Sequence, residues 1–368
     1  MRILQIINNI AWGGAGNLLI NYIPIMKNSG HDIDLLTLKQ IDKYHLDNFK
    51  KIGIKIITLS ENSLYNPLYI FKIKQFIKKG NYDIVHVHLF PALYYVGLAA
   101  YFGIKSKLVF TEHNTWNTRM SNPVLRIIDK FIYRKYKMVI CITDKVKLNM
   151  QNHLKGLNIL YPVVYNGINV SKFSNAIVSH LYKKDLYQSY SVENIILIMV
   201  GRFVIQKDQK TLIEAIFLLP QNFHLLLIGD GPTKPECEKL TNELQLNDRI
   251  RFMGIRKDIP DILKLCDIGI LSSNWEGFPI TALEYMASNK PVIVSDVPGL
   301  SDTVGDVALL FEKGNSEQLA NKIVELIDNK EYYNAVAKKC YEKAQEYDIK
   351  KMTEKYLELY QDLLKEKK

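Results

Sequence analysis

The sequence predicts an α/β protein built from two doubly wound parallel sheets. Apolar strands alternate with helical stretches along most of the chain, which is typical of parallel strands joined by crossover helices. A length of 368 residues allows two such domains. The hydrophobic content of 48% and charged content of 23% indicate a globular, soluble chain and exclude a disordered one.

Strand signals divide the chain into two sets. In the first half we expect strands at residues 1–10, 32–38, 55–59, 84–88, 107–111 and 138–142, with a last strand and turn at 161–170. In the second half we expect them at residues 195–200, 225–229, 250–253, 268–272 and 291–294. The polar stretch 174–191 lacks hydrophobic periodicity and is predicted to be the linker. The predicted domains are therefore residues 1–180 and 191–350.

One apolar run requires a choice between a membrane span and a buried element. Residues 84–104 carry no charged side chain and are numerous enough to cross a bilayer. They contain His86, His88 and Pro91, and the first five alternate as a strand does, so we expect a strand followed by a helix. No signal peptide is expected at the start, and four scattered cysteines favour a reduced, cytoplasmic chain.

The positive charge lies in the first half of the chain. The net charge is +10, of which residues 1–184 contribute +16 and residues 185–368 contribute −6. The segment 119–137 concentrates this charge at helical spacing in Arg126, Lys130 and Arg134, beside apolar side chains at 124, 127, 128 and 131. Such a helix can lie in an anionic membrane interface, although a surface helix packed on its own sheet has the same pattern.

The stretch 274–300 predicts an anion site. Pro279 suits the first position of a helix, where the amides of Ile280 and Thr281 would face an anion. Glu276 precedes that helix start and Glu284 lies about one and a half turns inside it. One carboxylate can therefore face a group beyond the anion and the other a group beside it, as in a diphosphate between a sugar and a ribose.

Two other loops carry candidate ligand-binding residues. Gly201 and Arg202 end a predicted strand and Lys207 follows, so that an Arg fork and a Lys point charge could clamp a diphosphate. The glycine-rich loop 11–17, with Gly14 and Gly16, lets backbone approach a ligand, but its spacing is not the dinucleotide fingerprint. We expect no metal site, because His86 and His88 have no further candidate ligands nearby in the sequence.

These motifs together resemble the retaining glycosyltransferases of family four, which have the GT-B fold. The resemblance rests on E-x7-E within EGFPITALEYMASNKPVIVSDVPG and on G-R-x4-K, and it covers nearly the whole chain. The fold it implies is two Rossmann-like domains facing across a cleft, with a last helix, 351–368, crossing back to the first. It also implies donor-binding residues, namely Gly14, Gly16, Gly201, Gly254, Ile255, Gly277, Phe278, Pro279, Ile280 and Glu284.

The function implied is transfer of a hexose or N-acetylhexosamine, with retention, from a nucleoside-diphosphate sugar, a UDP-sugar being favoured. The resemblance assigns the donor sugar to Glu276 and His113, and the ribose to Glu284. Arg202 and Lys207 would stabilise the departing diphosphate without metal or cofactor. The basic first domain suggests a lipid-linked saccharide acceptor and a peripheral position at the cytoplasmic face of the cell membrane, as in surface polysaccharide synthesis.

Three rival functions remain. An epimerase of similar fold would isomerise the sugar of the nucleotide without any acceptor. A non-catalytic subunit could bind the nucleotide sugar alone, although the joint presence of Arg202, Lys207, Glu276 and Glu284 argues against it. A nucleic-acid binder would use the basic half, but no recognition motif appears there, so no nucleic-acid partner is expected.

Overall fold

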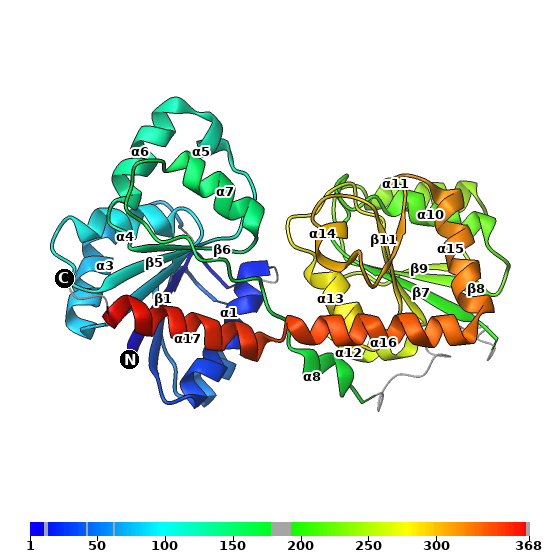
Figure 1. Ribbon diagram of the computed structural model, residues 1–368, viewed down its shortest axis with the longest axis horizontal. Coiled ribbons are helices and arrows are strands. Elements are labelled where there is room, and N and C mark those ends of the chain that lie inside the picture. Colours follow the sequence, from blue (N-terminus) through cyan, green and yellow to red (C-terminus); the bar gives the residue numbers. More distant parts are fainter. Residues whose placement is uncertain (11–13, 42, 62, 178–192, 366–368) are drawn as a thin grey trace. The chain divides into compact units, whose positions relative to one another are not determined.

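The computed structural model describes residues 1–10, 14–41, 43–61, 63–177 and 193–365 and divides into two compact units. Unit 1 is Met1–Gly167 together with Ile349–Lys368, and unit 2 is Ile168–Asp348. Each unit is organised around a parallel sheet of six strands with helices packed on it (Figure 1). The α/β class and the parallel sheets expected from the sequence are confirmed.

The sheet of unit 1 has the strand order β3-β2-β1-β4-β5-β6. Its strands are β1 Arg2–Ile7, β2 Asp32–Lys39, β3 Lys55–Ser60, β4 Ile84–His88, β5 Lys107–Glu112 and β6 Met138–Cys141. Its helices are α1 Gly14–Asn28, α2 Lys43–Lys51, α3 Tyr69–Gly80, α4 Ala92–Ala100, α5 Thr118–Ser121, α6 Pro123–Tyr133, α7 Asp144–His153 and α17 Ile349–Lys365.

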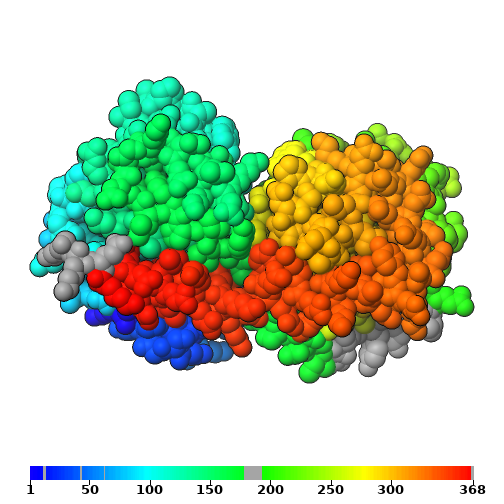
Figure 2. All heavy atoms as spheres, in the orientation of Figure 1, coloured from blue at the N-terminus to red at the C-terminus, as the bar shows by residue number. Residues whose placement is uncertain are grey.

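The central strands of unit 1 are buried on both faces, which is why they read as nearly continuous apolar runs. Side chains alternate across a strand, so Ile3, Gln5 and Ile7 share one face of β1. On that face the core is completed by α1 and α17, which pack against each other. The end of the chain thus contributes to the core of unit 1, and Figure 2 shows α17 in red along its surface.

The sheet of unit 2 has the strand order β12-β11-β10-β7-β8-β9. Its strands are β7 Ile195–Val200, β8 Phe223–Ile228, β9 Ile250–Phe252, β10 Ile268–Leu271, β11 Val292–Ser295 and β12 Leu309–Phe311. Its helices are α8 Val170–Ser174, α10 Gln209–Leu218, α11 Lys234–Glu243, α12 Ile259–Leu265, α13 Ile280–Ala287, α14 Ser301–Val304, α15 Ser316–Asp328 and α16 Lys330–Glu346.

Two boundaries differ from the prediction. Unit 2 begins at Ile168 rather than after the polar stretch, because α8 packs on α12 and α13 of that unit. The helix that returns to unit 1 begins at Ile349, two residues before the predicted start. Most of the predicted linker, residues 178–191, lies outside the described residues.

Residues 161–170, predicted as a last strand and turn, do not form a continuous strand of the sheet. It meets β6 only through isolated bridges, at Leu160 and Val163, and Val170 already begins α8. Pro162 supplies a carbonyl to Cys141 but has no N–H to extend a ladder.

The apolar run 84–104 forms β4 and α4, as predicted. Across the described ranges, no helix is both long enough and apolar enough to pass through a bilayer. The cysteines at 141, 237, 266 and 340 are all buried free thiols.

Candidate functional site

Two loops of unit 2 meet at the carboxyl edge of its sheet. The strands β7 and β10 are parallel neighbours, so the loop 201–208 after β7 and the loop 272–279 after β10 leave the sheet side by side. Asn274 ties the loops together: its backbone N–H donates to the Gln206 carbonyl over 2.7 Å and its side-chain amide donates to the Ile205 carbonyl over 2.7 Å. Open α/β sheets bind ligands at this edge.

The loops bring together two residues predicted from separate motifs. The Lys207 ammonium lies 2.5 Å from Oε1 of Glu276, and the Ser273 hydroxyl donates to the same oxygen over 2.7 Å. The Glu276 side chain is only 6% exposed and that of Lys207 18%. Glu276 is therefore a carboxylate already held by a cation and a hydroxyl, with Gln206 as a weaker donor 3.4 Å from Oε2.

Arg202 differs from Lys207. It is exposed, and no ion pair or side-chain hydrogen bond joins it to another residue of the described part of the chain. The sequence placed Arg202 and Lys207 together on a diphosphate. The structure puts both in one loop but gives Lys207 an internal partner, so a bound anion would share this cation with Glu276.

The structure corrects the predicted position of Pro279 in α13. Pro279 is the N-cap of α13 rather than its first residue, with φ −87° and ψ 70°. This is the conformation of an inverse γ-turn, and the Ile280 N–H accordingly donates to the Phe278 carbonyl over 3.0 Å. The Ile280 amide is therefore not free for an anion, contrary to the prediction.

Glu284 lies in the second turn of α13, half-buried. Burial raises the pKa of its carboxyl to about 7, and the nearby Lys172 of α8 partly offsets this. Lys172 was missed by sequence reasoning because α8 is more than a hundred residues away in the chain. Near neutral pH, Glu284 can thus exist in either protonation state.

Glycines allow the loops at this edge to approach one another. Gly299 has φ +90°, and a Cβ there would lie 2.2 Å from the Glu276 carbonyl oxygen. Gly229 has φ +139°, and a Cβ there would lie 2.0 Å from the Gly201 oxygen. Both positions therefore require glycine. Their motifs, VPG and GDG, were visible in the sequence, but the contact they permit was not.

The remaining predicted donor residues occupy the same sheet edge. Gly254 follows β9, and its carbonyl accepts from the Gly229 N–H over 2.8 Å. Ile255 beside it is 72% exposed. Gly277 is exposed in the β10–α13 loop, whereas the half-buried Phe278 ring packs edge-on against Tyr347 at 5.8 Å.

In unit 1, His113 follows β5 and is half-buried. Its Nε2 lies 3.2 Å from Nδ1 of the fully buried His88, and burial lowers the pKa of His113 to about 4. Gly14 and Gly16 lie in the first turn of α1, not in a loop ahead of Leu18, and Gly16 is buried. The helix begins earlier than predicted, and residues 11–13 of the glycine-rich loop lie outside the described residues.

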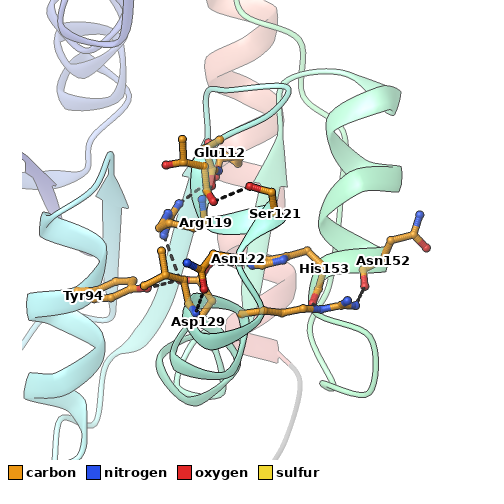
Figure 3. A network of polar contacts seen from close by, with 12 residues as sticks. Tyr94, Glu112, Arg119, Ser121, Asn122, Asp129, Asn152 and His153 are labelled. Atoms are coloured by element: carbon orange, nitrogen blue, oxygen red, sulfur yellow. Dashed lines mark hydrogen bonds and ion pairs between the residues drawn. The ribbon is translucent and has the colours of Figure 1, made fainter.

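The basic helix predicted in unit 1 is broken at Asn122, whose side chain caps α6. The inward face of α6 carries Asp129, which is 1% exposed. Its carboxylate accepts from Tyr94 over 2.5 Å and from Arg119 over 3.1 Å, and it lies 2.7 Å from His153 Nε2 (Figure 3). This buried network fixes which face of α6 points outward.

The outward face of α6 is apolar. We call it the α6 ridge, and it consists of Val124, Ile127, Ile128 and Phe131, which are 65%, 71%, 40% and 46% exposed. Tyr101 stacks on Phe131 with ring centroids 4.4 Å apart. This helix does pack on its own sheet, but through the buried Ile132 and Tyr133, the latter edge-on to Phe110 of β5, and not through the four apolar residues that the sequence singled out.

The predicted cations around this ridge are not equivalent. Arg134 is exposed and Lys130 is half-buried. Arg126 instead donates to the carbonyls of His153 and Asn152, at 3.0 and 2.6 Å, at the end of α7. Lys135 lies 3.9 Å from the Tyr101 ring centroid and adds a cation that the sequence did not single out.

Within the described ranges, no group of three or more His, Cys, Asp or Glu side chains could hold a metal ion. The charged side chains discussed above at the unit 2 edge are those of Lys207, Arg202, Glu276 and Glu284.

Comparison with known families agrees with this division. The family model described as Glycosyltransferase Family 4 matches residues 12–172, and that described as Glycosyl transferases group 1 matches residues 188–346. The chain is 25% identical over 368 residues to N-acetyl-alpha-D-glucosaminyl L-malate synthase of Bacillus anthracis, covering 97% of this chain and 96% of the relative.

Two further similarities extend over almost the whole chain. A UDP-Gal:alpha-D-GlcNAc-diphosphoundecaprenol alpha-1,3-galactosyltransferase of Escherichia coli is 24% identical, covering 95% of this chain and 94% of the relative. The crystal structure of Anabaena Alr3699/HepE in complex with UDP and glucose superposes with a TM-score of 0.82 at 21% identity, covering 98% of this chain and all of that one. The two matched family models and the two sheets show that the chain belongs to the glycosyltransferases of family 4 and group 1, and that it has their GT-B fold.

Proposed function

We propose that this glycosyltransferase moves a hexose or N-acetylhexosamine, with retention, from a UDP-sugar to a hydroxyl of a lipid-linked saccharide in surface polysaccharide synthesis. The observation that carries the proposal is the cluster of Lys207, Arg202 and Glu276 at the carboxyl edge of the unit 2 sheet. A UDP donor is supported by the E. coli relative, whose name specifies UDP-Gal.

Arg202 and Lys207 can meet the main requirement of this reaction, which is to stabilise the leaving diphosphate. When the bond between the anomeric carbon and the diphosphate oxygen breaks, the diphosphate gains negative charge. Arg202 is exposed and Lys207 is partly exposed, so both can bind phosphate oxygens, and fixed donors of this kind stabilise a leaving group without a metal. The acceptor oxygen forms the new bond on the same face, and its proton passes to the leaving phosphate.

Glu276 is assigned to binding rather than to nucleophilic attack. Its Oε1 already accepts from Lys207 and Ser273, which lowers the availability of its lone pairs for a covalent intermediate. We propose that it orients sugar hydroxyls, which can donate to the carboxylate. Glu284 would accept from the ribose, and the backbone near Gly254 and Ile255 would border the base.

The two named relatives act on different acceptors, an undecaprenol diphosphate saccharide and L-malate. The α6 ridge favours the lipid-linked acceptor for this chain. Its apolar side chains are exposed next to Arg134 and Lys135, so the ridge can enter the interface of an anionic membrane while cations meet lipid phosphates. We propose that the enzyme is peripheral to the membrane.

A direct test supplies radiolabelled UDP-glucose, UDP-galactose, UDP-GlcNAc and GDP-mannose in turn, each with a polyprenyl-diphosphate-linked GlcNAc or with L-malate. We expect transfer from a UDP-sugar to the lipid-linked saccharide, and an α-configured product by NMR. Transfer to L-malate alone would overturn the acceptor assignment, and a β product would overturn retention.

The rivals give different results in the same assay. Conversion of one nucleotide sugar into its epimer without acceptor would identify an epimerase. Nucleotide binding without any turnover, for every donor and both acceptors, would identify a non-catalytic subunit.

A further inference from the structure

A chain of hydrogen-bonded polar side chains runs through the interior of unit 1 to His113. It joins β1, α1 and β4, and its members are buried, apart from His113 at its end. It consists of Gln5, Tyr22 and His88, each within hydrogen-bonding distance of the other two, and then His113. A second group, Thr111, His86 and Tyr360, lies beside it, with the His86 ring centroid 4.2 Å from that of His88.

Each of these histidines carries one proton. Burial lowers the pKa of His86 and His88 well below the usual range, and that of His113 to about 4. At neutral pH each ring is therefore neutral, with one nitrogen that donates and one that accepts. A proton on one nitrogen determines what the other nitrogen can do.

The Gln5 side-chain amide determines which groups donate and which accept in these hydrogen bonds. Its Oε1 accepts from the Tyr22 hydroxyl over 2.9 Å and lies 3.0 Å from His88 Nε2. A carbonyl oxygen can only accept, and the Tyr22 hydroxyl, which gives its proton to Gln5, can accept from His88 Nε2 over 3.1 Å, so this arrangement favours a proton on His88 Nε2.

The proton position of His88 determines that of the half-buried His113. With its proton on Nε2, His88 has a lone pair on Nδ1, and that atom lies 3.2 Å from Nε2 of His113. His113 Nε2 must then donate. The Nδ1 atom of His113 is left unprotonated, and it has no hydrogen-bond partner in the described part of unit 1.

We propose that Gln5 and His88 are positioning residues that hold the proton of His113 on Nε2, so that its Nδ1 accepts a hydrogen bond from a sugar hydroxyl. The proton position follows from unit 1 alone, whereas the sugar as its ligand rests on the proposed function.

The first test is the proton position in the unmodified protein. Protein labelled with 15N only in histidine gives ring nitrogen shifts that distinguish the two tautomers, and His113→Gln identifies the signal of His113. We expect a fixed Nε2-protonated ring. A Nδ1-protonated ring, or one averaged between tautomers, would overturn the proposal.

Variants then test which residues control the proton. We expect His88→Leu to give an averaged His113 ring, and His88→Asn, whose amide oxygen can still accept from Nε2, to keep the Nε2 tautomer. The matched control is His45→Gln, which changes another buried histidine of unit 1, on α2, outside the chain. If His45→Gln averages the ring as much as His88→Leu does, positioning by His88 is wrong.

Kinetics separate this proposal from the proposed function. For His88→Leu we expect kcat/KM to fall about tenfold, the value of one hydrogen bond of about 1.4 kcal/mol, with rescue by His88→Asn. A fixed Nε2 tautomer in a protein that transfers no sugar would leave the proton assignment standing and remove the proposed function. Full transfer activity together with an averaged His113 ring would overturn the proton assignment and leave the proposed function standing. If the variants do not fold, the spectrum of the unmodified protein still decides the proton position.

Discussion

The two units have the same sheet but opposite ways of handling charge at its carboxyl edge. Read from the other end, the order β12-β11-β10-β7-β8-β9 repeats the order of unit 1. In unit 2 this edge carries a charged pair, Lys207 and Glu276, beside an exposed arginine. In unit 1 it carries neutral histidines ending at His113, its ion pair between Glu112 and Arg119 is largely buried, and the α6 ridge exposes apolar side chains.

The contrast suggests that each edge suits a different part of the substrates. A diphosphate favours cations, whereas a lipid interface favours apolar area. One parallel sheet can provide either, because the loops that follow its strands set the chemistry and the strands only set their positions.

Removal of the cation should test the charged edge most severely. We expect Lys207→Met to lower kcat for sugar transfer about 100-fold to 1000-fold, as the loss of one fixed transition-state donor does. The measurement is steady-state transfer from the preferred UDP-sugar. Lys234→Met, which removes a lysine of α11 paired with Glu238, is the control and should retain activity. Equal losses of kcat in both variants would mean that transfer depends on the overall positive charge of unit 2 and not on Lys207 in particular.

The apolar surface of unit 1 can be tested without the reaction. We expect Ile127→Glu to weaken binding to vesicles of anionic phospholipid by about tenfold to 100-fold, because burial of such a side chain is worth about 1.5–3 kcal/mol. Vesicle sedimentation measures this. Phe217→Glu, at a 55% exposed position on α10 of unit 2, should bind as the unmodified protein does. Undiminished binding by Ile127→Glu would show that the α6 ridge does not meet the membrane.

The raised pKa of Glu284 predicts a pH dependence of nucleotide binding. The carboxyl ionises as the pH rises through about 7, and only the ionised form accepts from two ribose hydroxyls. We therefore expect UDP to bind about tenfold more tightly at pH 8 than at pH 6, by calorimetry. Glu284→Gln cannot ionise and should show no such rise. A rise that persists in that variant must come from another group, such as the nucleotide phosphate.

The smallest expected effect is a loss of stability at Gly299, which lies against the backbone of Glu276 at the unit 2 sheet edge. We expect Gly299→Ala to destabilise the protein by about 1–3 kcal/mol, because its φ is +90° and the new Cβ meets the Glu276 carbonyl. Urea unfolding measures the loss. Gly314→Ala is the matched control, with φ +77° and no atom within 4 Å of the new Cβ, so it should cost only the backbone term of about 1 kcal/mol. Equal losses would show that the contact with Glu276 does not matter.

Much of the fold was predictable because its signals are local. Strand β7, for example, is a six-residue apolar run and was predicted with its observed ends. Element boundaries were less predictable where a neighbour intervenes. The sequence could not show that α8 belongs to unit 2, since that depends on its packing against α12 and α13.

The candidate site shows the same division. The sequence by itself determined the residue types, Arg202, Lys207 and the two glutamates, because their spacing around strand ends is a local property. Only the tertiary structure decided their partners. It paired Lys207 with Glu276, placed Lys172 near Glu284, and turned the apolar face of α6 outward, because these contacts join segments far apart in the chain. The hydrogen bond between His86 and Tyr360 in unit 1 is the strongest case, since 274 residues separate these two residues in the chain.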